Sequence, residues 1–413
     1  MTLNINIIRG QDQIGGSIIE LYTETTRIIL DAGANLGEGR LHTSVPKVPG
    51  LFDGKPAYDA VFVSHYHSDH MGLLKYVVPG IPIYMGRVTY DIARAISEHT
   101  GRKLDFEPEI IESEVPVAIG DITLTPIPCD HSAYGSFMFL VQACGKTVLY
   151  SADYRSTGRS DFSALLEKLP EVDVLITEGT TLSRGPDFHE PTEQELEDFA
   201  VETLKGHKGP AIVYLSAQNV ERIITAYNAS KRSGRRFIMD ELTAVVAEAA
   251  GLDIDAYVLR SSHSFADLGE IVATSIGGLG SRGKKNSSRY PAVSSRNAFS
   301  SPDFMLCLTP QSLINFRKVS QRTSFKDSVL FFARRETHML KPAATAFISF
   351  LKSLGAEVPM LHTSGHADSG TIDRLIRDVR PAVIIPVHTE KSDWFDRYAD
   401  ECLVVFDCHD YEV

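Results

Sequence analysis

Four metal-binding side chains crowd into six positions of the chain, in the stretch HYHSDH at 65–70. The apolar run Val61–Val63 directly before it is typical of a buried strand that ends in a turn. Imidazole and carboxylate groups together suit Zn²⁺ and similar cations. Four such groups cannot all crowd one tetrahedral site, so the stretch predicts two neighbouring metal ions. The ligands that it would provide are His65, His67, Asp69 and His70.

Two metal ions need further ligands from other parts of the chain. Three more apolar segments end in a residue of a metal-binding type, in the stretches PIPCDHS, VLYSADYR and VIIPVHTE. Each resembles the first stretch, in which a strand delivers ligands at its end. We therefore predict His131, Asp153 and His388 as the additional ligands. Asp130 is a further candidate, but the imidazole of its neighbour His131 is the stronger ligand type.

The composition is that of a soluble globular protein, with 43% hydrophobic and 23% charged residues among 413. No apolar run reaches the roughly 18 residues of a membrane-spanning helix. The N-terminus, MTLNINIIRG, lacks the basic and apolar regions of a signal peptide. The five cysteines of the chain are scattered and form no CxxC pair, which favours reduced thiols. We expect a cytoplasmic protein without a membrane partner.

Charge is unevenly distributed along the chain, although the net charge is −12. Residues 205–341 carry 20 Lys and Arg against 11 Asp and Glu, so the middle is basic and both flanks are acidic. A basic lobe would favour an anionic substrate. Chance segregation of solvated charges is the alternative.

The order of strand and helix signals predicts an α/β fold with an insertion. The first part is rich in short β-branched strands, and strand and helix alternate after about residue 190, which is typical of a parallel sheet. Apolar strands that end in histidine return in EVPMLHTSGHA and PAVIIPVHTE. Residues 275–302, rich in Gly, Ser and basic residues, are expected to form a mobile surface loop. The predicted domains are 1–185, an inserted domain at 186–345, and a completion of the first domain at 346–413.

The motifs also resemble those of a known family. HxHxDH, DHS and YSADYR occur in the order found in metallo-β-lactamase fold hydrolases, and RIILDAG resembles their first motif. LITEGTT, TSGHA and PVHTE resemble three further motifs of the β-CASP nucleases, a branch that includes ribonuclease J. The resemblance covers essentially the whole chain. It implies a metallo-β-lactamase αββα sandwich with an inserted α/β β-CASP domain.

Carried over to this chain, the resemblance implies a role for each site residue. One metal ion would be bound by His65, His67 and His131, and the other by Asp69, His70 and His388. Asp153 would bridge both ions, and Asp31 would support the ligands from behind. The catalytic residues would be Asp69, His366 and Glu178, with Glu178 orienting His366 as the general acid. Zn²⁺ is the expected ion, and Mn²⁺ or Mg²⁺ are alternatives.

The implied activity is cleavage of phosphodiester bonds in single-stranded RNA or DNA by a metal-bound hydroxide. A histidine suits the general acid because its pKa lies near neutral pH. The residues expected to contact the substrate are Ser216, Asn219, Ser364, Lys284 and Lys285. Lysine contacts would hold phosphates without reading the base sequence.

Two departures from the family pattern leave the details of this activity open. Ribonuclease J proteins usually continue into a further C-terminal domain, whereas this sequence ends soon after His388. CLTPQSLINF, at 307–316, lacks the glycine of the family's GSQGE-like loop. Exo- or endonuclease action and assembly as a homodimer therefore stay open. The alternative functions are hydrolysis of a small carbonyl ester, thioester or lactone, and a non-catalytic scaffold that binds nucleic acid.

Overall fold

The computed structural model describes residues 1–37, 43–185, 188–259, 272–274, 293–294, 299, 301–321 and 323–413. The chain forms two compact units. Unit one consists of Met1–Ser97, Arg102–Glu190 and Ser364–Val413, and unit two consists of Glu98–Gly101 and Pro191–Thr363. Within the described residues, no helix has the length and apolar character that crossing a bilayer requires.

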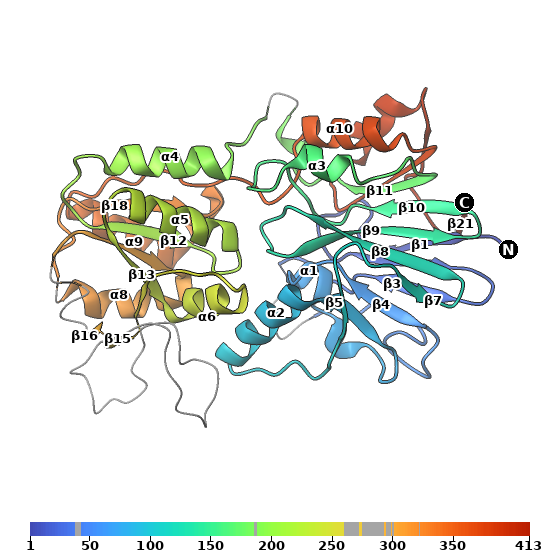
Figure 1. Ribbon diagram of the computed structural model, residues 1–413, viewed down its shortest axis with the longest axis horizontal. Helices are drawn as coiled ribbons and strands as arrows, with labels where there is room; N and C mark the ends of the chain where they lie inside the picture. The colour runs from blue at the N-terminus through green and yellow to red at the C-terminus, as the bar shows by residue number, and fades with distance from the viewer. Residues whose placement is uncertain are drawn as a thin grey trace. The chain divides into compact units, whose positions relative to one another are not determined.

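Unit one contains two seven-stranded sheets (Figure 1). The first has the order β21-β1-β2-β3-β4-β5-β6. Its strands are β1 (Asn4–Arg9), β2 (Ile18–Tyr22), β3 (Arg27–Leu30), β4 (Ala60–Val63), β5 (Ile83–Gly86), β6 (Glu109–Ile111) and β21 (Tyr411–Glu412). The second has the order β20-β19-β11-β10-β9-β8-β7. Its strands are β7 (Val117–Ile119), β8 (Ile122–Cys129), β9 (Ser136–Ala143), β10 (Lys146–Tyr150), β11 (Val174–Glu178), β19 (Val383–Val387) and β20 (Leu403–Val404).

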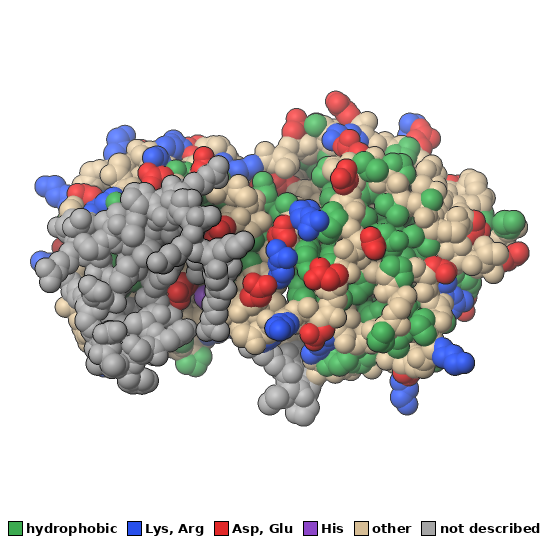
Figure 2. Space-filling view, turned by 60° about the horizontal axis from the view of Figure 1, so that its bottom comes forward, with side chains coloured by type: hydrophobic (Ala, Val, Ile, Leu, Met, Phe, Trp, Pro, Cys, Tyr) green, Lys and Arg blue, Asp and Glu red, His purple; other side chains and the backbone are tan. Residues whose placement is uncertain are grey.

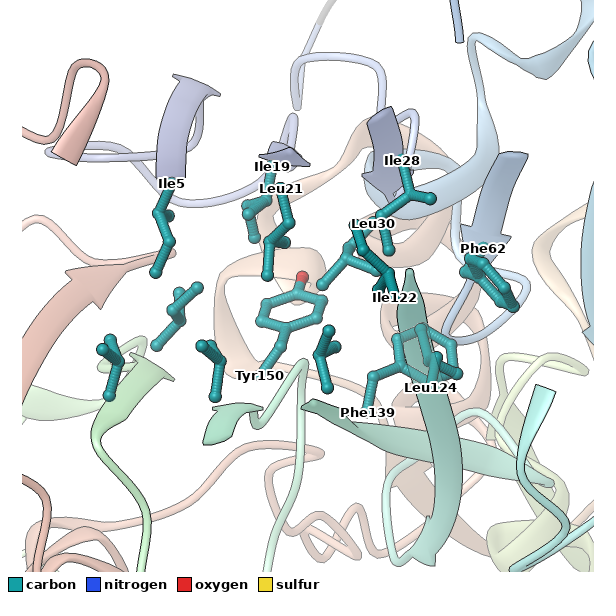
Figure 3. Packing of buried hydrophobic residues seen from close by; sticks show 14 of the residues in the cluster. Ile5, Ile19, Leu21, Ile28, Leu30, Phe62, Ile122, Leu124, Phe139 and Tyr150 are labelled. Carbon is teal, nitrogen blue, oxygen red and sulfur yellow. The ribbon is translucent and has the colours of Figure 1, made fainter. Parts of the chain in front are cut away.

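The two sheets pack face to face over an apolar core. Leu21, Leu30 and Phe62 of the first sheet meet Phe139 and Tyr150 of the second (Figure 3). Successive residues of a strand point to opposite faces, so one half of each strand fills this core. The other half faces the outer helices.

Helices cover the outer faces of both sheets in unit one. The helices are α1 (Ser68–Met71), η1 (Leu74–Tyr76), α2 (Arg87–His99), α3 (Phe162–Leu166), η2 (Leu182–Arg184), α10 (Ser369–Val379) and η5 (Ser392–Tyr398). Leu165 of α3 and Leu375 of α10 pack on the second sheet, and Leu74 and Tyr90 pack on the first. The helices lie outside the two sheets (Figure 1). This confirms the predicted αββα sandwich.

Basic and acidic side chains are interspersed over the surface of unit one on the face drawn in Figure 2. Hydrophobic side chains lie between them on the same face. No single sign of charge dominates the described part of that surface.

Unit two is built on a third sheet, with the order β16-β15-β14-β13-β17-β12-β18. Its strands are β12 (Ala211–Leu215), β13 (Arg236–Asp240), β14 (Tyr257–Leu259), β15 (Val272–Thr274), β16 (Val293–Ser294), β17 (Phe304–Leu308) and β18 (Val329–Ala333). β14, β13, β17, β12 and β18 are parallel to their neighbours in that series. The parallel sheet predicted from the alternation of strands and helices is thus confirmed.

Helices alternate with the strands of unit two. They are α4 (Glu193–Leu204), α5 (Val220–Arg232), α6 (Glu241–Ala249), η3 (Pro310–Ser312), α8 (Leu313–Ser320), η4 (Glu336–Leu340) and α9 (Pro342–Ser353). Thr192 and Glu195 form a capping box at the start of α4. Phe316 of α8 and Phe347 of α9 pack on one face of the sheet.

The structure differs from the sequence predictions in three places. Unit two extends to Thr363 rather than to the predicted 345, because Leu351 of α9 packs into its core and Met360 bridges to β18. EVPMLHTSGHA was expected to be a strand but forms only isolated bridges, since Pro359 has no N–H to donate. The predicted loop at 275–302 lies largely outside the described residues, and within it Val293–Ser294 form β16.

Candidate metal centre

The predicted ligands follow the ends of strands in unit one. Each strand is short and buried, so its end fixes the position of the loop that follows. His65 and His67 come directly after β4, and Asp69 and His70 lie in α1. The other predicted ligands also follow strands: His131 follows β8, Asp153 follows β10 and His388 follows β19. Of the other two predicted catalytic residues, Glu178 lies at the end of β11 and His366 lies before α10.

These side chains form three overlapping groups whose ligand atoms lie within 4.8 Å of one another. The groups are His65, His67, His131 and Asp153; Asp69, His70 and His388; and Asp153, Glu178, His366 and His388. The structure therefore brings together every ligand predicted from the sequence. The first two groups match the two predicted sets, and Asp153 is shared between the first group and the third.

Asp153 lies at the centre of the cluster. Its Oδ2 is 3.2 Å from His70 Nε2, 3.7 Å from His131 Nε2 and 3.8 Å from His65 Nε2. Its Oδ1 is 3.7 Å from His388 Nε2. The carboxylate is 1% exposed and neither of its oxygens has a hydrogen-bond partner. Such a buried carboxylate is stable only if positive charge faces it.

Asp31 holds the imidazole ring of His70 directly and that of His65 through Ser64. It accepts hydrogen bonds from His70 Nδ1, from the Ser64 hydroxyl and from the Tyr150 hydroxyl, each at 2.8 Å. Because the Ser64 hydroxyl donates to Asp31, it is free to accept from His65 Nδ1 at 3.0 Å. Both rings are thus fixed through Nδ1, and Nε2 of each ring faces Asp153.

The outward nitrogens of His131 and His388 are held in the same way. His131 Nδ1 donates to the carbonyl of Gly365. A side chain at Gly365 would lie 2.4 Å from the Ser132 hydroxyl, so glycine permits this close approach. His388 Nδ1 lies 2.8 Å from the hydroxyl of Thr180, which donates to the His388 carbonyl at 3.1 Å.

The electrostatics of the cluster favour neutral imidazoles at three histidines and an ionised carboxylate at Asp153, whereas His70 is shifted toward its charged form. Burial and the neighbouring imidazoles lower the pKa of His65 and His131, and burial lowers the pKa of His67 to about 4. Burial would raise the pKa of Asp153, but the surrounding histidines hold it well below its usual range. For His70, burial lowers the pKa, but Asp153 and Asp31 raise it by more.

The cluster as a whole fits a bound cation. His65 Nε2, His70 Nε2 and both oxygens of Asp153 are buried and make no hydrogen bond. Buried polar atoms normally have a partner, so four unsatisfied atoms that face one centre indicate a metal-binding site. Imidazole and carboxylate ligands with fixed outer partners are the arrangement expected for Zn²⁺-type ions.

His366 and Glu178 form a pair beside these ligands. His366 Nδ1 lies 3.0 Å from Glu178 Oε2 and 3.2 Å from Oε1. Glu178 is itself fixed, because its oxygens accept from the backbone N–H of Tyr154 and of Thr180. The His366 side chain is 12% exposed, whereas Glu178 is buried. A carboxylate on Nδ1 leaves Nε2 available for proton transfer.

One buried ion pair near the cluster was not foreseen from the sequence. Arg155, 1% exposed, donates to Asp130 Oδ1 at 2.7 Å and to the carbonyl of Ser364 at 3.0 Å. Asp130 precedes His131, and Ser364 lies two residues before His366, so Arg155 links three loops of the site. Its only sequence signal is its position two residues after Asp153. Asp130 is thereby engaged with Arg155 rather than with the ligand cluster.

We expect Arg155→Ala to lower the free energy of unfolding by about 3–5 kcal/mol, because Asp130 would be left buried without its counter-ion. Replacing both partners, Arg155→Met with Asp130→Ala, should recover most of that stability. It should not recover activity, since no side chain then holds the Ser364 carbonyl. Chemical denaturation with activity measurements checks this. Full activity in the double variant would show that the link to Ser364 does not position the site.

The predicted substrate-binding residues lie in different parts of the chain. The Ser364 hydroxyl accepts from the backbone N–H of His366 at 3.2 Å in unit one. Asn219, in unit two, caps α5 by accepting from the N–H of Arg222 at 3.0 Å. Ser216, also in unit two, follows β12. Lys284 and Lys285 lie outside the described residues.

Two family models match the chain. Residues 26–209 match the beta-lactamase superfamily domain. Residues 354–403 match the Zn-dependent metallo-hydrolase RNA specificity domain. The first match contains His65 to Asp153, and the second contains His366 and His388.

Several characterised proteins are similar to the chain. Ribonuclease J of Helicobacter pylori (strain B128) is 21% identical over 418 residues, which cover 94% of this chain and 56% of that protein. Ribonuclease J of Mycolicibacterium smegmatis is 22% identical and covers 94% of this chain and 68% of its own length. Transcription termination factor FttA of Methanosarcina mazei is 26% identical over 43% of this chain and 31% of its own length. The chain thus spans 56% of the length of the Helicobacter relative.

The fold is also shared with a solved structure. A crystal structure of a protein of unknown function from Enterococcus faecalis V583 matches 100% of both chains with a TM-score of 0.78 at 20% identity. That likeness concerns the fold alone. The two family models and the similarity to ribonuclease J over 94% of this chain show that it belongs to the metallo-β-lactamase superfamily and resembles ribonuclease J of the β-CASP branch.

Proposed function

We propose that the chain is a metal-dependent nuclease that cleaves phosphodiester bonds of single-stranded RNA, with two divalent ions bound in the cluster and Zn²⁺ as the expected ion. The observation that carries the proposal is the pairing of His366 with Glu178 at 3.0 Å beside the ligand cluster. Similarity to proteins named ribonuclease J supports RNA as the substrate.

Phosphodiester hydrolysis requires groups that activate water, hold the phosphate and protonate the departing sugar oxygen. Bound divalent ions would supply a Lewis acid and make water acidic enough to attack at neutral pH. His65, His67 and His131 would hold one ion and Asp69, His70 and His388 the other, with Asp153 between them. The ligand atoms of each group already lie within 4.8 Å of one another, so little rearrangement of the side chains is needed on binding.

His366 is assigned as the general acid. Glu178 accepts its Nδ1 proton and stabilises the charged imidazole, so that Nε2 can give a proton to the leaving oxygen. Ser364 holds the backbone N–H of His366 and so fixes the loop. Ser216, Asn219, Lys284 and Lys285 stay predictions as substrate contacts.

The test is incubation with 5′- and 3′-labelled single-stranded RNA and DNA of the same base sequence, with product lengths read on a gel. Cleavage of RNA that stops with a chelator and returns with Zn²⁺ or Mn²⁺ is expected. Stepwise shortening would show exonuclease action from the labelled or unlabelled end, and discrete fragments would show endonuclease action.

Two other outcomes would contradict the proposal. Hydrolysis of a thioester or lactone by a protein that leaves both oligonucleotides intact would identify a carbonyl hydrolase. Metal-loaded protein that binds the oligonucleotides without cleaving them would identify a scaffold.

A further inference from the structure

A group of basic side chains lies at the carboxyl end of β18, the last strand of the sheet in unit two, and near the end of its neighbour β12. β12 and β18 are parallel neighbours, and Leu215 at the end of β12 pairs with Ala333 at the end of β18. Ser216 and Arg334 therefore continue the chain from the same edge of the sheet. In sheets of parallel strands, this edge is where ligands most often bind.

The chain returns to this edge through α9. Glu357 and Met360 bridge to β18 in parallel, so β18, α9 and the segment at 357–360 form one crossover unit. In such a unit, the helix begins at the carboxyl end of the preceding strand. Lys341, which precedes the first residue of α9, thus lies at the same end as Arg334. The first turn of α9 contains no acidic residue.

Arg334 is half-buried without a counter-ion. Its guanidinium carbon lies 5.9 Å from the centre of the Tyr214 ring, and burial lowers the pKa of Arg334. Neither Arg334 nor Lys341 pairs with a carboxylate within the described part of the chain. A partly buried guanidinium without a carboxylate partner keeps a positive charge that a bound anion would balance.

The pKa of His338 is lowered by burial and by the positive charges around it. Burial, followed by the nearby Arg334, Lys341 and Arg335, lowers the pKa of His338 to about 4. Its Nδ1 is buried and has no hydrogen-bond partner among the described residues. Arg334 and Lys341 are like charges without a carboxylate partner in the described part of the chain, and a bound anion would offset their mutual repulsion.

We propose that Arg334, Lys341 and His338 bind a phosphate group, supplied by the backbone of the RNA substrate. Arg334 would offer a planar pair of donors, Lys341 a second charge, and His338 a neutral N–H donor. The inference rests on the proposed function for the source of the phosphate, but the site requires only a phosphate. Ser216, which the sequence analysis predicted to contact the substrate, follows the neighbouring strand β12 at the same edge of the sheet as Arg334.

The test uses the full chain with a His366→Ala background, so that RNA is bound without being cleaved. Fluorescence anisotropy of labelled single-stranded RNA is measured over a series of salt concentrations for Arg334→Gln, Lys341→Gln and the control Lys352→Gln. Lys352 is exposed at the other end of α9, so the control makes the same change of charge on the same helix. In a second arm, thermal unfolding is followed with and without inorganic phosphate.

Arg334→Gln and Lys341→Gln should each weaken RNA binding and reduce the slope of log K against log salt by about 0.7, while Lys352→Gln leaves both unchanged. Without phosphate, Arg334→Gln should be at least as stable as its parent, because an unbalanced cation is removed. Phosphate should raise the Tm of the parent more than that of Arg334→Gln.

Three other results are informative about the proposed phosphate site. If Arg334→Gln and Lys341→Gln bind RNA with the parent's salt slope and respond to phosphate as the parent does, the site is refuted. If RNA is neither bound nor cleaved while the phosphate response still depends on Arg334, the site stands and the proposed function fails. If Arg334→Gln does not fold, Lys341→Gln, at an exposed position, decides alone.

Discussion

His366→Ala is expected to reduce RNA cleavage by about 100-fold or more while the protein keeps its bound metal, because a general acid contributes roughly 10²–10⁴-fold. In the proposed mechanism, Glu178 holds His366 through Nδ1 at 3.0 Å and leaves Nε2 for proton transfer. The measurements are initial rates on labelled RNA and metal content by elemental analysis. His99→Ala, at an exposed histidine that ends α2, is the matched control.

A substrate whose leaving group needs no proton can distinguish loss of the general acid from a general loss of activity. A p-nitrophenyl phosphodiester releases an acidic alcohol that departs without needing a proton. Its hydrolysis should therefore suffer much less from His366→Ala than RNA cleavage does. His366 shares a ligand-type group with Asp153 and His388. Loss of metal in His366→Ala would make His366 a ligand, and an equal loss of rate on both substrates would remove its assigned role as the general acid.

The strands and the ligand positions could be predicted because their signals are local, whereas the αββα sandwich was predicted from the resemblance to a known family. Strands in a sandwich alternate or run apolar over a few residues, and turn residues mark their ends. The ligands stand directly after those ends, as His388 does after β19. One motif alone indicated metal, and the repetition of strand-end ligands indicated a shared centre.

The parts that could not be predicted depend on contacts between loops that are distant in sequence. Ser64 and Thr180 each fix a ligand ring, yet a serine or threonine beside a motif has no distinctive pattern. Arg155 joins the Asp130 and Ser364 loops, which only the folded sheet brings together. The phosphate site proposed at Arg334 could not be predicted either, because the lack of a carboxylate partner depends on which residues the fold places around Arg334.

Asp153→Asn is expected to have the largest effect of any single substitution, with loss of bound metal and a fall in activity greater than that of His366→Ala. The carboxylate faces His65, His70, His131 and His388 within 3.8 Å, and both of its oxygens lack hydrogen bonds. An amide keeps the shape but removes the charge. It also places an N–H₂ group against lone pairs that should bind a cation.

Metal content and thermal unfolding, each measured with and without a chelator, check this expectation. The parent protein should lose stability when the chelator removes its metal, because an ion that binds only the folded state stabilises it. Asp153→Asn should show no such difference, while Asp393→Asn, an exposed carboxylate of unit one, should behave as the parent does. Retention of the full metal content by Asp153→Asn would mean that the histidines and Asp69 hold the ions without it. Asp153 would then be a partner that orients those rings rather than the ligand shared between two ions.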